Sequence, residues 1–188
     1  AYLGLGGDGA IHPEAVDPNL AGVAVAVVGE DADRATWNAM RAAFEKSVDE
    51  TVRGRILYGL AVAKNPELSA AARELSLDPA LRDNEVTSPL SAQWSRPETR
   101  DVAWAWLKEH LDAVLARLPR HHGGSGLVAS SVRSQCDDAR AQEAEALFAP
   151  RVDHIDGGPR ALSLAVEDVR LCAARKKAHE ASARAFFK

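Results

Sequence analysis

The sequence has few aromatic residues and no long apolar run, and each shortage excludes a class of protein. Phe, Trp and Tyr together make up 5% of the 188 residues. No uninterrupted apolar stretch approaches the roughly 20 residues that a membrane-spanning helix requires. Acidic and basic side chains are interspersed around a net charge of −4, so the basic stripe that typifies nucleic-acid-binding surfaces is missing. The composition predicts a globular protein that binds neither nucleic acid nor a membrane.

Cysteine is equally scarce. The chain contains two, Cys136 and Cys172, and neither has a close partner of metal-ligand type. Two cysteines form neither a disulfide-rich framework nor a four-ligand zinc site. We expect each to be a buried structural thiol, the common state of a free cysteine, and leave open that the two are bonded to each other.

Catalytic and cofactor signatures are incomplete. His179-Glu180 begins the zinc-peptidase pattern H-E-x-x-H, but Ala183 stands where the second histidine is needed. Gly4–Gly9 matches G-x-G-x-x-G, yet only three residues precede it, so the strand that a dinucleotide site requires has no room. His121-His122 is interpreted as a solvated pair beside a glycine-rich loop. The sequence therefore predicts no catalytic residues, no metal site and no cofactor in this chain.

Helical periodicity dominates what is present. Alanine, the best helix former, supplies much of the hydrophobic fraction of 46%. Apolar residues recur at spacings of three and four in segments 37–48, 52–63, 103–118 and 162–173, which is the pattern of amphipathic helices. The segment Val23–Val28 alternates valine with alanine, so a buried helix and an extended strand both fit it.

The breaks between these segments suggest a repeating array. Helix pairs are expected to begin near residues 18, 49, 84, 125 and 159, an uneven spacing typical of armadillo- and HEAT-like proteins. In such arrays no pair buries its own apolar face, and stacking completes the core. We predict an all-α fold, a superhelical stack of antiparallel helix pairs, with residues 1–16 as a glycine-rich lead-in segment and 17–188 as the α-helical repeat domain.

Two neighbouring tryptophans test the facing of the helix expected after Pro97. Trp104 and Trp106 are two residues apart, which places them about 200° apart around a helix. Trp104 flanks the apolar stripe of segment 103–118 and is predicted to be buried. Trp106 is predicted to lie nearer the surface or an inter-domain contact.

Three segments carry a resemblance to a known family. They are GRILYGLAVAKNPELSAAARELSLDPALRDNEV (54–86), RPETRDVAWAWLKEHLDAVLARLP (96–119) and EAEALFAPRVDHIDGGPRALSLAVEDVRLCAARKK (143–177). In order and spacing they resemble the C-terminal domain of the gluzincin zinc aminopeptidases, the family of the puromycin-sensitive and endoplasmic-reticulum aminopeptidases. The alanine-rich style and the LCAARKK ending look like a proteobacterial branch. Many members have an Asn and a Trp on the last long helix, where this chain has Cys172 and Arg175, so residue-level transfer from animal enzymes is weak.

The resemblance implies a non-catalytic domain of a larger enzyme. Zinc would be held by an upstream catalytic domain of the same chain, and the helical domain would close over it and shape peptide access and length preference. Because the chain does not begin with methionine, we interpret it as an excised piece whose compartment, cytoplasm or cell envelope, is open. The alternative is a stand-alone helical-repeat adaptor that binds a protein partner. An upstream H-E-x-x-H followed by a glutamate would distinguish the two.

The resemblance also suggests where peptide substrates bind. In the animal relatives a basic residue near the break before the tryptophan-bearing helix lies close to the C-terminal end of the peptide. Arg96 resembles that residue in position, and Arg82 and Asn84 precede the same helix. The planar guanidinium of an arginine can hold a carboxylate by two parallel charge-assisted hydrogen bonds. Arg96, Arg82 and Asn84 are therefore the candidate peptide-binding residues.

Overall fold

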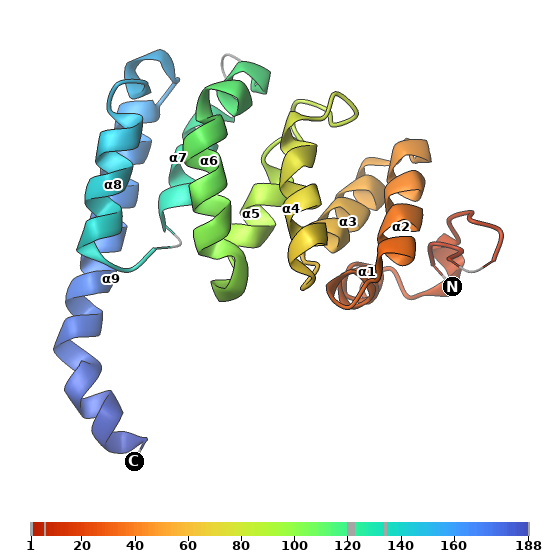
Figure 1. Ribbon diagram of the computed structural model, residues 1–188, viewed down its shortest axis with the longest axis horizontal. Coiled ribbons are helices and arrows are strands. Elements are labelled where there is room, and N and C mark those ends of the chain that lie inside the picture. The colour runs from red at the N-terminus through yellow and green to blue at the C-terminus, as the bar shows by residue number, and fades with distance from the viewer. Residues whose placement is uncertain (1, 6, 120–122, 134, 188) are drawn as a thin grey trace. The chain divides into compact units, whose positions relative to one another are not determined.

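The computed structural model describes residues 2–5, 7–119, 123–133 and 135–187. Within these ranges all regular secondary structure is helical, which confirms the prediction of an all-α fold (Figure 1). The segment Val23–Val28, which could have been a strand, lies inside helix α1. The chain divides into two compact units, Ala1–Arg117 (unit 1) and Leu118–Lys188 (unit 2).

The helix boundaries follow the predicted breaks. Helices α1, α3, α5, α7 and α9 begin at residues 21, 50, 88, 124 and 158, close to the expected pair starts. Unit 1 contains α1 (Ala21–Glu30), α2 (Arg34–Lys46), α3 (Glu50–Ala61), α4 (Pro66–Glu74), α5 (Ser88–Trp94) and α6 (Pro97–Arg117), with 3-10 turns η1 (Pro13–Ala15) and η2 (Leu75–Leu77). Unit 2 contains α7 (Gly124–Arg133), α8 (Asp138–Phe148), η3 (Val152–His154) and α9 (Gly158–Phe186).

Side-chain caps explain why several helices start where they do. The Asp33 carboxylate accepts a hydrogen bond from the backbone N–H of Thr36 at 2.7 Å, and Asp49 accepts one from Val52 at 2.8 Å. Asn65 accepts from the N–H groups of the second and third residues of α4, as its position before Pro66 predicts. Each cap satisfies donors that the first helical turn leaves unpaired.

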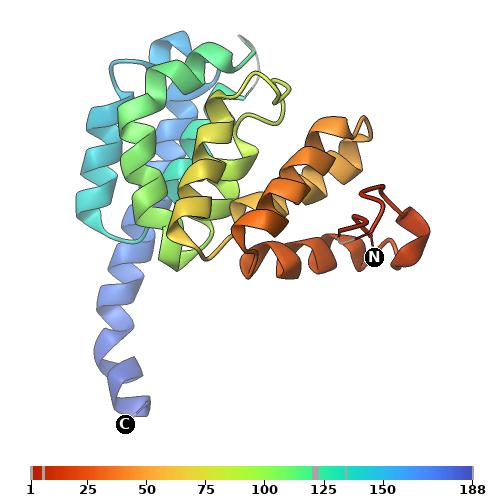
Figure 2. The same ribbon diagram turned by 45° about the vertical axis from the view of Figure 1, so that its right-hand side comes forward.

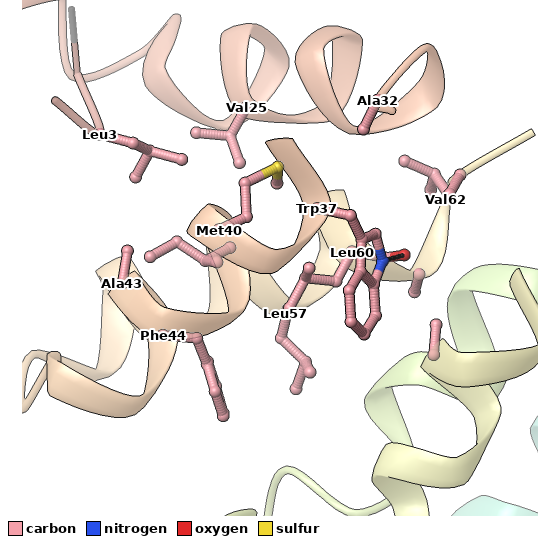
Figure 3. Packing of buried hydrophobic residues seen from close by; sticks show 14 of the residues in the cluster. Leu3, Val25, Ala32, Trp37, Met40, Ala43, Phe44, Leu57, Leu60 and Val62 are labelled. Carbon is pink, nitrogen blue, oxygen red and sulfur yellow. Dashed lines mark hydrogen bonds between the residues drawn. The ribbon is translucent and has the colours of Figure 1, made fainter. Parts of the chain in front are cut away.

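The core of unit 1 is built around α3, which contacts α1, α2, α4 and α5. Met40, Phe44 and Ile56 are fully buried there, and the Trp37 indole N–H donates to the Leu60 carbonyl at 3.1 Å (Figure 3). Helices α1 and α3 cross closely at Gly29 and Gly59, where a side chain on either residue would collide with the other helix. The lead-in segment joins this core, since the side chains of Tyr2 and Leu3 are buried in the same cluster.

The two tryptophans of α6 are both buried. Trp104 is 1% exposed, which confirms its predicted burial. Trp106 is more exposed than Trp104, but only at 9%, because α4 packs against this side of α6. Its indole N–H donates to the Glu74 carboxylate at 2.6 Å, and its ring stacks on His110. Because Glu74 on α4 accepts the indole N–H, Trp106 can be buried even though it lies on the face of α6 that was expected to be exposed.

In unit 2, α9 packs against α7, α8 and η3. Its buried residues end at Val169, and Figures 1 and 2 show its C-terminal half extending beyond α7 and α8. The two cysteines form a disulfide, so the expectation of buried free thiols is wrong. Cys172 follows Val169, the last buried residue of α9, at a spacing of three, and the connection between α7 and α8 brings Cys136 to it. A separation of 36 residues concealed this contact from sequence inspection.

Candidate functional site

A pocket of about 560 Å³ in unit 1 contains the first of the candidate residues, Arg96. It lies between the α3–α4 connection, the face of α4 that carries Ser69 and Arg73, and the start of α6. Three basic side chains, Lys64, Arg73 and Arg96, and one acidic side chain, Glu98, line it. Val62, Pro66 and Val102 form its apolar part. We call it the Arg96 pocket. Three cations beside an apolar wall suit a ligand that carries a carboxylate next to an apolar group, although Glu98 in the same lining offsets part of their charge.

Arg96 itself lies in the turn between α5 and α6 and is half-buried. Its guanidinium donates to the Glu30 carboxylate at 2.8 Å, and the Lys64 ammonium lies 3.2 Å from the other oxygen of the same group. The hydrogen bonds from Arg96 and Lys64 hold the pKa of the Glu30 carboxyl below its ordinary value. Glu30 thus orients Arg96, and Glu30 and Asp31, which is 3.0 Å from the Lys64 ammonium, together orient Lys64 and offset part of the charge of both cations.

Arg73 is the basic residue of the pocket that lacks such a partner among the described residues. Its Nη1 donates to the Gln93 side-chain oxygen at 2.9 Å and to the Ser69 hydroxyl at 3.3 Å, both neutral acceptors. Its Nε is buried and makes no hydrogen bond in the described part of the chain. Burial lowers the pKa of the Arg73 guanidinium, and the charge of the neighbouring Glu74 opposes this shift only in part.

Gln93 fixes the direction in which Arg73 points. This glutamine is fully buried, and its amide donates to the Ser69 carbonyl at 2.8 Å and to the Ala61 carbonyl at 3.3 Å. With both amide hydrogens bound to the backbone, the side-chain oxygen is directed toward Arg73. The guanidinium is therefore held by α4 and α5 together, before any ligand binds.

Sequence inspection missed Arg73 and Lys64. One signal was available for Arg73: it follows Ser69 by four residues, so two polar side chains share one face of an otherwise alanine-rich helix. No comparable signal marked Lys64, whose position in the pocket depends on the turn between α3 and α4.

The other two candidates, Arg82 and Asn84, lie elsewhere. Arg82 donates to the Val48 carbonyl at 3.1 Å and Asn84 donates to the Glu50 carboxylate at 2.9 Å, so both are at the N-terminal end of α3. The Arg96 pocket lies at the C-terminal end of that helix. Since α3 has 12 residues, its ends are about 18 Å apart. The structure therefore places Arg96 in one location and Arg82 with Asn84 in another.

A buried ion pair holds the loop that carries Arg82 and Asn84. The Arg53 guanidinium donates to both carboxylate oxygens of Glu85, at 2.6 and 2.7 Å. It also donates to three backbone carbonyls and lies 4.0 Å from the centre of the Phe44 ring. Burial alone would raise the pKa of Glu85, but the hydrogen bonds from Arg53 and the Arg82 backbone bring it below its ordinary value. The N–H groups of Arg53 and the carboxylate oxygens of Glu85 all have hydrogen-bond partners within the chain, so this ion pair has a structural role.

The residues rejected as metal or catalytic sites do not converge either. Glu180 pairs with Arg184 at 2.7 Å on the exposed part of α9. His121-His122 lies outside the described residues. Within the described ranges no three His, Cys, Asp or Glu side chains are grouped so that they could hold a metal ion, so these residues do not fit a zinc site. None of the described helices is long and apolar enough to cross a membrane.

Comparison with known proteins adds two findings. The family model described as the ERAP1-like C-terminal domain matches residues 4–171. Aminopeptidase M1-B from Oryza sativa subsp. japonica is 29% identical over 140 residues, which cover 74% of this chain and 16% of that relative. The matched region is thus about a sixth of the rice protein.

Proposed function

This chain belongs to the family of ERAP1-like C-terminal domains, and from that premise we propose that it is the non-catalytic C-terminal domain of a zinc aminopeptidase. The name of the rice relative supports an aminopeptidase, and the 16% of its length that is matched leaves room for a catalytic domain. In this proposal the zinc belongs to that upstream domain of the same polypeptide. The helical domain closes over it and shapes which peptides enter and how long they are.

The Arg96 pocket carries this proposal. A peptide that reaches the helical domain from a distant catalytic centre ends in a carboxylate, and Arg73 lines the pocket with only neutral hydrogen-bond acceptors among the described residues. Val62, Pro66 and Val102 provide an apolar wall for the last side chain. Arg96 and Lys64 add positive charge, although Glu30 competes for both. Arg82 and Asn84, at the other end of α3, would contact a different part of a long peptide.

The test uses the full-length enzyme and two kinds of substrate. Arg96→Ala and Arg73→Ala should each weaken hydrolysis of long peptides, because a hydrogen bond to a charged group is worth about 1.5–3 kcal/mol, on the order of ten-fold or more in kcat/KM. A single-aminoacyl reporter is too short to reach the pocket and should be hydrolysed at the wild-type rate.

Two controls keep the result specific. Arg34→Ala removes a cation of unit 1 that pairs with Glu67 at the surface, and it should change the rate of hydrolysis of neither the long peptide nor the short reporter. Long peptides with an amidated C-terminus should be insensitive to Arg73→Ala, because the carboxylate is gone. Equal effects on long and short substrates, or no effect on either, would contradict the proposed role of the pocket.

A further inference from the structure

The only two cysteines of the chain come from different elements and meet in unit 2. Cys136 lies in the connection between α7 and α8, Cys172 lies on α9, and their Cα atoms are 5.2 Å apart in the disulfide. That separation is within the usual range for a bridge that needs no backbone movement. Cys136 is half-buried, whereas Cys172 is exposed.

The disulfide lies at the point where α9 leaves its packing partners. Val169 is the last buried residue of this helix, and from Arg170 to Phe187 every side chain except that of Ala173 is exposed. The contacts described near this point include the exposed ion pairs Arg133–Asp168 and Arg170–Glu145, a kind of pair that contributes little in water. The covalent bond therefore fastens α9 to the α7–α8 connection where packing no longer does.

We propose that Cys136–Cys172 is a maturation site, oxidised by a dithiol–disulfide oxidoreductase in an oxidising compartment, and that the protein acts there and not in the reducing cytosol. Structural disulfides persist in exported proteins and in the cell envelope, and they are rare where thiols are kept reduced. This inference is independent of the proposed peptide-binding role, because it depends on unit 2 alone.

The chemistry is an exchange between two disulfides. The exposed Cys172 thiol loses its proton, and the thiolate attacks the disulfide of the oxidoreductase, which releases one of its sulfurs as a thiolate. The Cys136 thiolate then attacks Cys172 Sγ in the mixed disulfide and releases the second sulfur of the oxidoreductase. In total, two thiols of this chain lose two protons and two electrons, and the disulfide of the oxidoreductase becomes a dithiol.

The decisive measurement is made on the full-length protein in the cells that produce it. Cells are quenched in acid, free thiols are alkylated, and the protein is digested with trypsin without reduction. Cleavage after Arg133, Arg140, Arg170 and Arg175 releases segments 134–140 and 171–175, each with one cysteine. We expect these two peptides as one linked pair that separates on reduction. Recovery of both as singly alkylated peptides from cells that contain folded, active protein would overturn the proposal.

A second measurement tests whether the bond supports the fold. For a closed loop of this length, breaking the bond is expected to lower Tm by on the order of 10 °C. A reductant should therefore lower the Tm of the wild-type protein and leave that of the double variant Cys136→Ser/Cys172→Ser unchanged. Wild-type and double variant melting together without reductant, with free thiols detected in the wild-type protein under the same conditions, would show that the bond is not formed and would overturn the proposal.

Discussion

Units 1 and 2 stabilise themselves differently. Unit 1 turns charged side chains inward: Arg53 and Glu85 are 6% and 8% exposed, and the amide of Gln93 is buried beside Arg73. In unit 2 the pairs Arg133–Asp168 and Arg170–Glu145 lie at the surface, and a disulfide joins α9 to the rest. The smaller unit has less apolar surface to bury, and a covalent bond compensates for that deficit.

The difference also explains why the candidate pocket is in unit 1. A site for a charged ligand needs cations whose positions are set before the ligand arrives, and this requires buried polar groups with all partners in place. Gln93 does this for Arg73, and Glu30 does it for Arg96 and Lys64. A disulfide stiffens the chain but presents no charge, so the arrangement of unit 2 suits attachment of a helix better than recognition of a carboxylate.

The largest expected difference in the free energy of unfolding is between removing a buried charge and removing an exposed one. Arg53→Ala should destabilise unit 1 by about 3–5 kcal/mol, because it leaves Glu85 buried without its counter-ion. The matched change in unit 2, Arg170→Ala, should cost less than about 1 kcal/mol, since its partner Glu145 remains in water. Urea unfolding followed by circular dichroism measures both, and similar losses for the two variants would remove the contrast between the units.

Truncating a buried apolar side chain should lower the free energy of unfolding by a similar amount in the two units. Trp104 in unit 1 and Phe148 in unit 2 are 1% and 0% exposed, and truncation of either to alanine should cost about 3–5 kcal/mol. The same denaturant titrations apply. Trp106→Ala should cost less than Trp104→Ala, because Trp106 lies at the margin of the core and keeps one edge near solvent. The opposite ranking would mean that the facing of α6 is misjudged.

Much of the fold could be predicted from the sequence, because its determinants are local. Apolar spacing in 37–48 identified α2, and the cap of Asn65 with Pro66 identified the start of α4. The family was likewise recognisable from three segments, and the match over residues 4–171 confirms that resemblance. The proposed proteobacterial branch stays a prediction.

The parts that were missed depend on contacts between distant segments. Cys136 and Cys172 are 36 residues apart, and only the packing of α9 brings them together. Burial of Trp106 requires Glu74 from α4, 32 residues away. The pocket around Arg96 combines α4 with the α3–α4 turn, so its strongest unpaired cation, Arg73, carries no local motif. Periodicity locates a face of a helix, but it does not identify which residues of another helix meet that face.

A smaller effect follows from pH. The folded-state pKa of Glu85 is below its ordinary value of 4.5, so its contribution to stability is complete above that value and is lost as pH falls through the folded-state pKa. The disulfide of unit 2 does not titrate, and its contribution stays constant over the same range. Unfolding free energies measured from neutral pH to about pH 3 should fall, with a shallower slope in Glu85→Gln. An unchanged slope in that variant would assign the acid sensitivity to other carboxyl groups.

The smallest expected effect concerns side-chain helix caps, a feature that is present in both units. Asn65 accepts hydrogen bonds from the N–H groups of Glu67 and Leu68 in unit 1, and Asp137 accepts one from Arg140 in unit 2. Replacing either by alanine should cost about 1 kcal/mol, because donors in the first helical turn lose their acceptor. Asn65→Asp is the matched control: it keeps the acceptor and adds negative charge at a helix N-terminus, so stability should be unchanged or slightly higher. Helix α4 also carries Arg73, so the cap can be compared with activity in the full-length enzyme. If Asn65→Ala lost hydrolysis of long peptides and Asn65→Asp kept it, the cap would be connected to the Arg96 pocket. If Asn65→Asp were as unstable as Asn65→Ala in urea titrations, the cap would not be what fixes the start of α4.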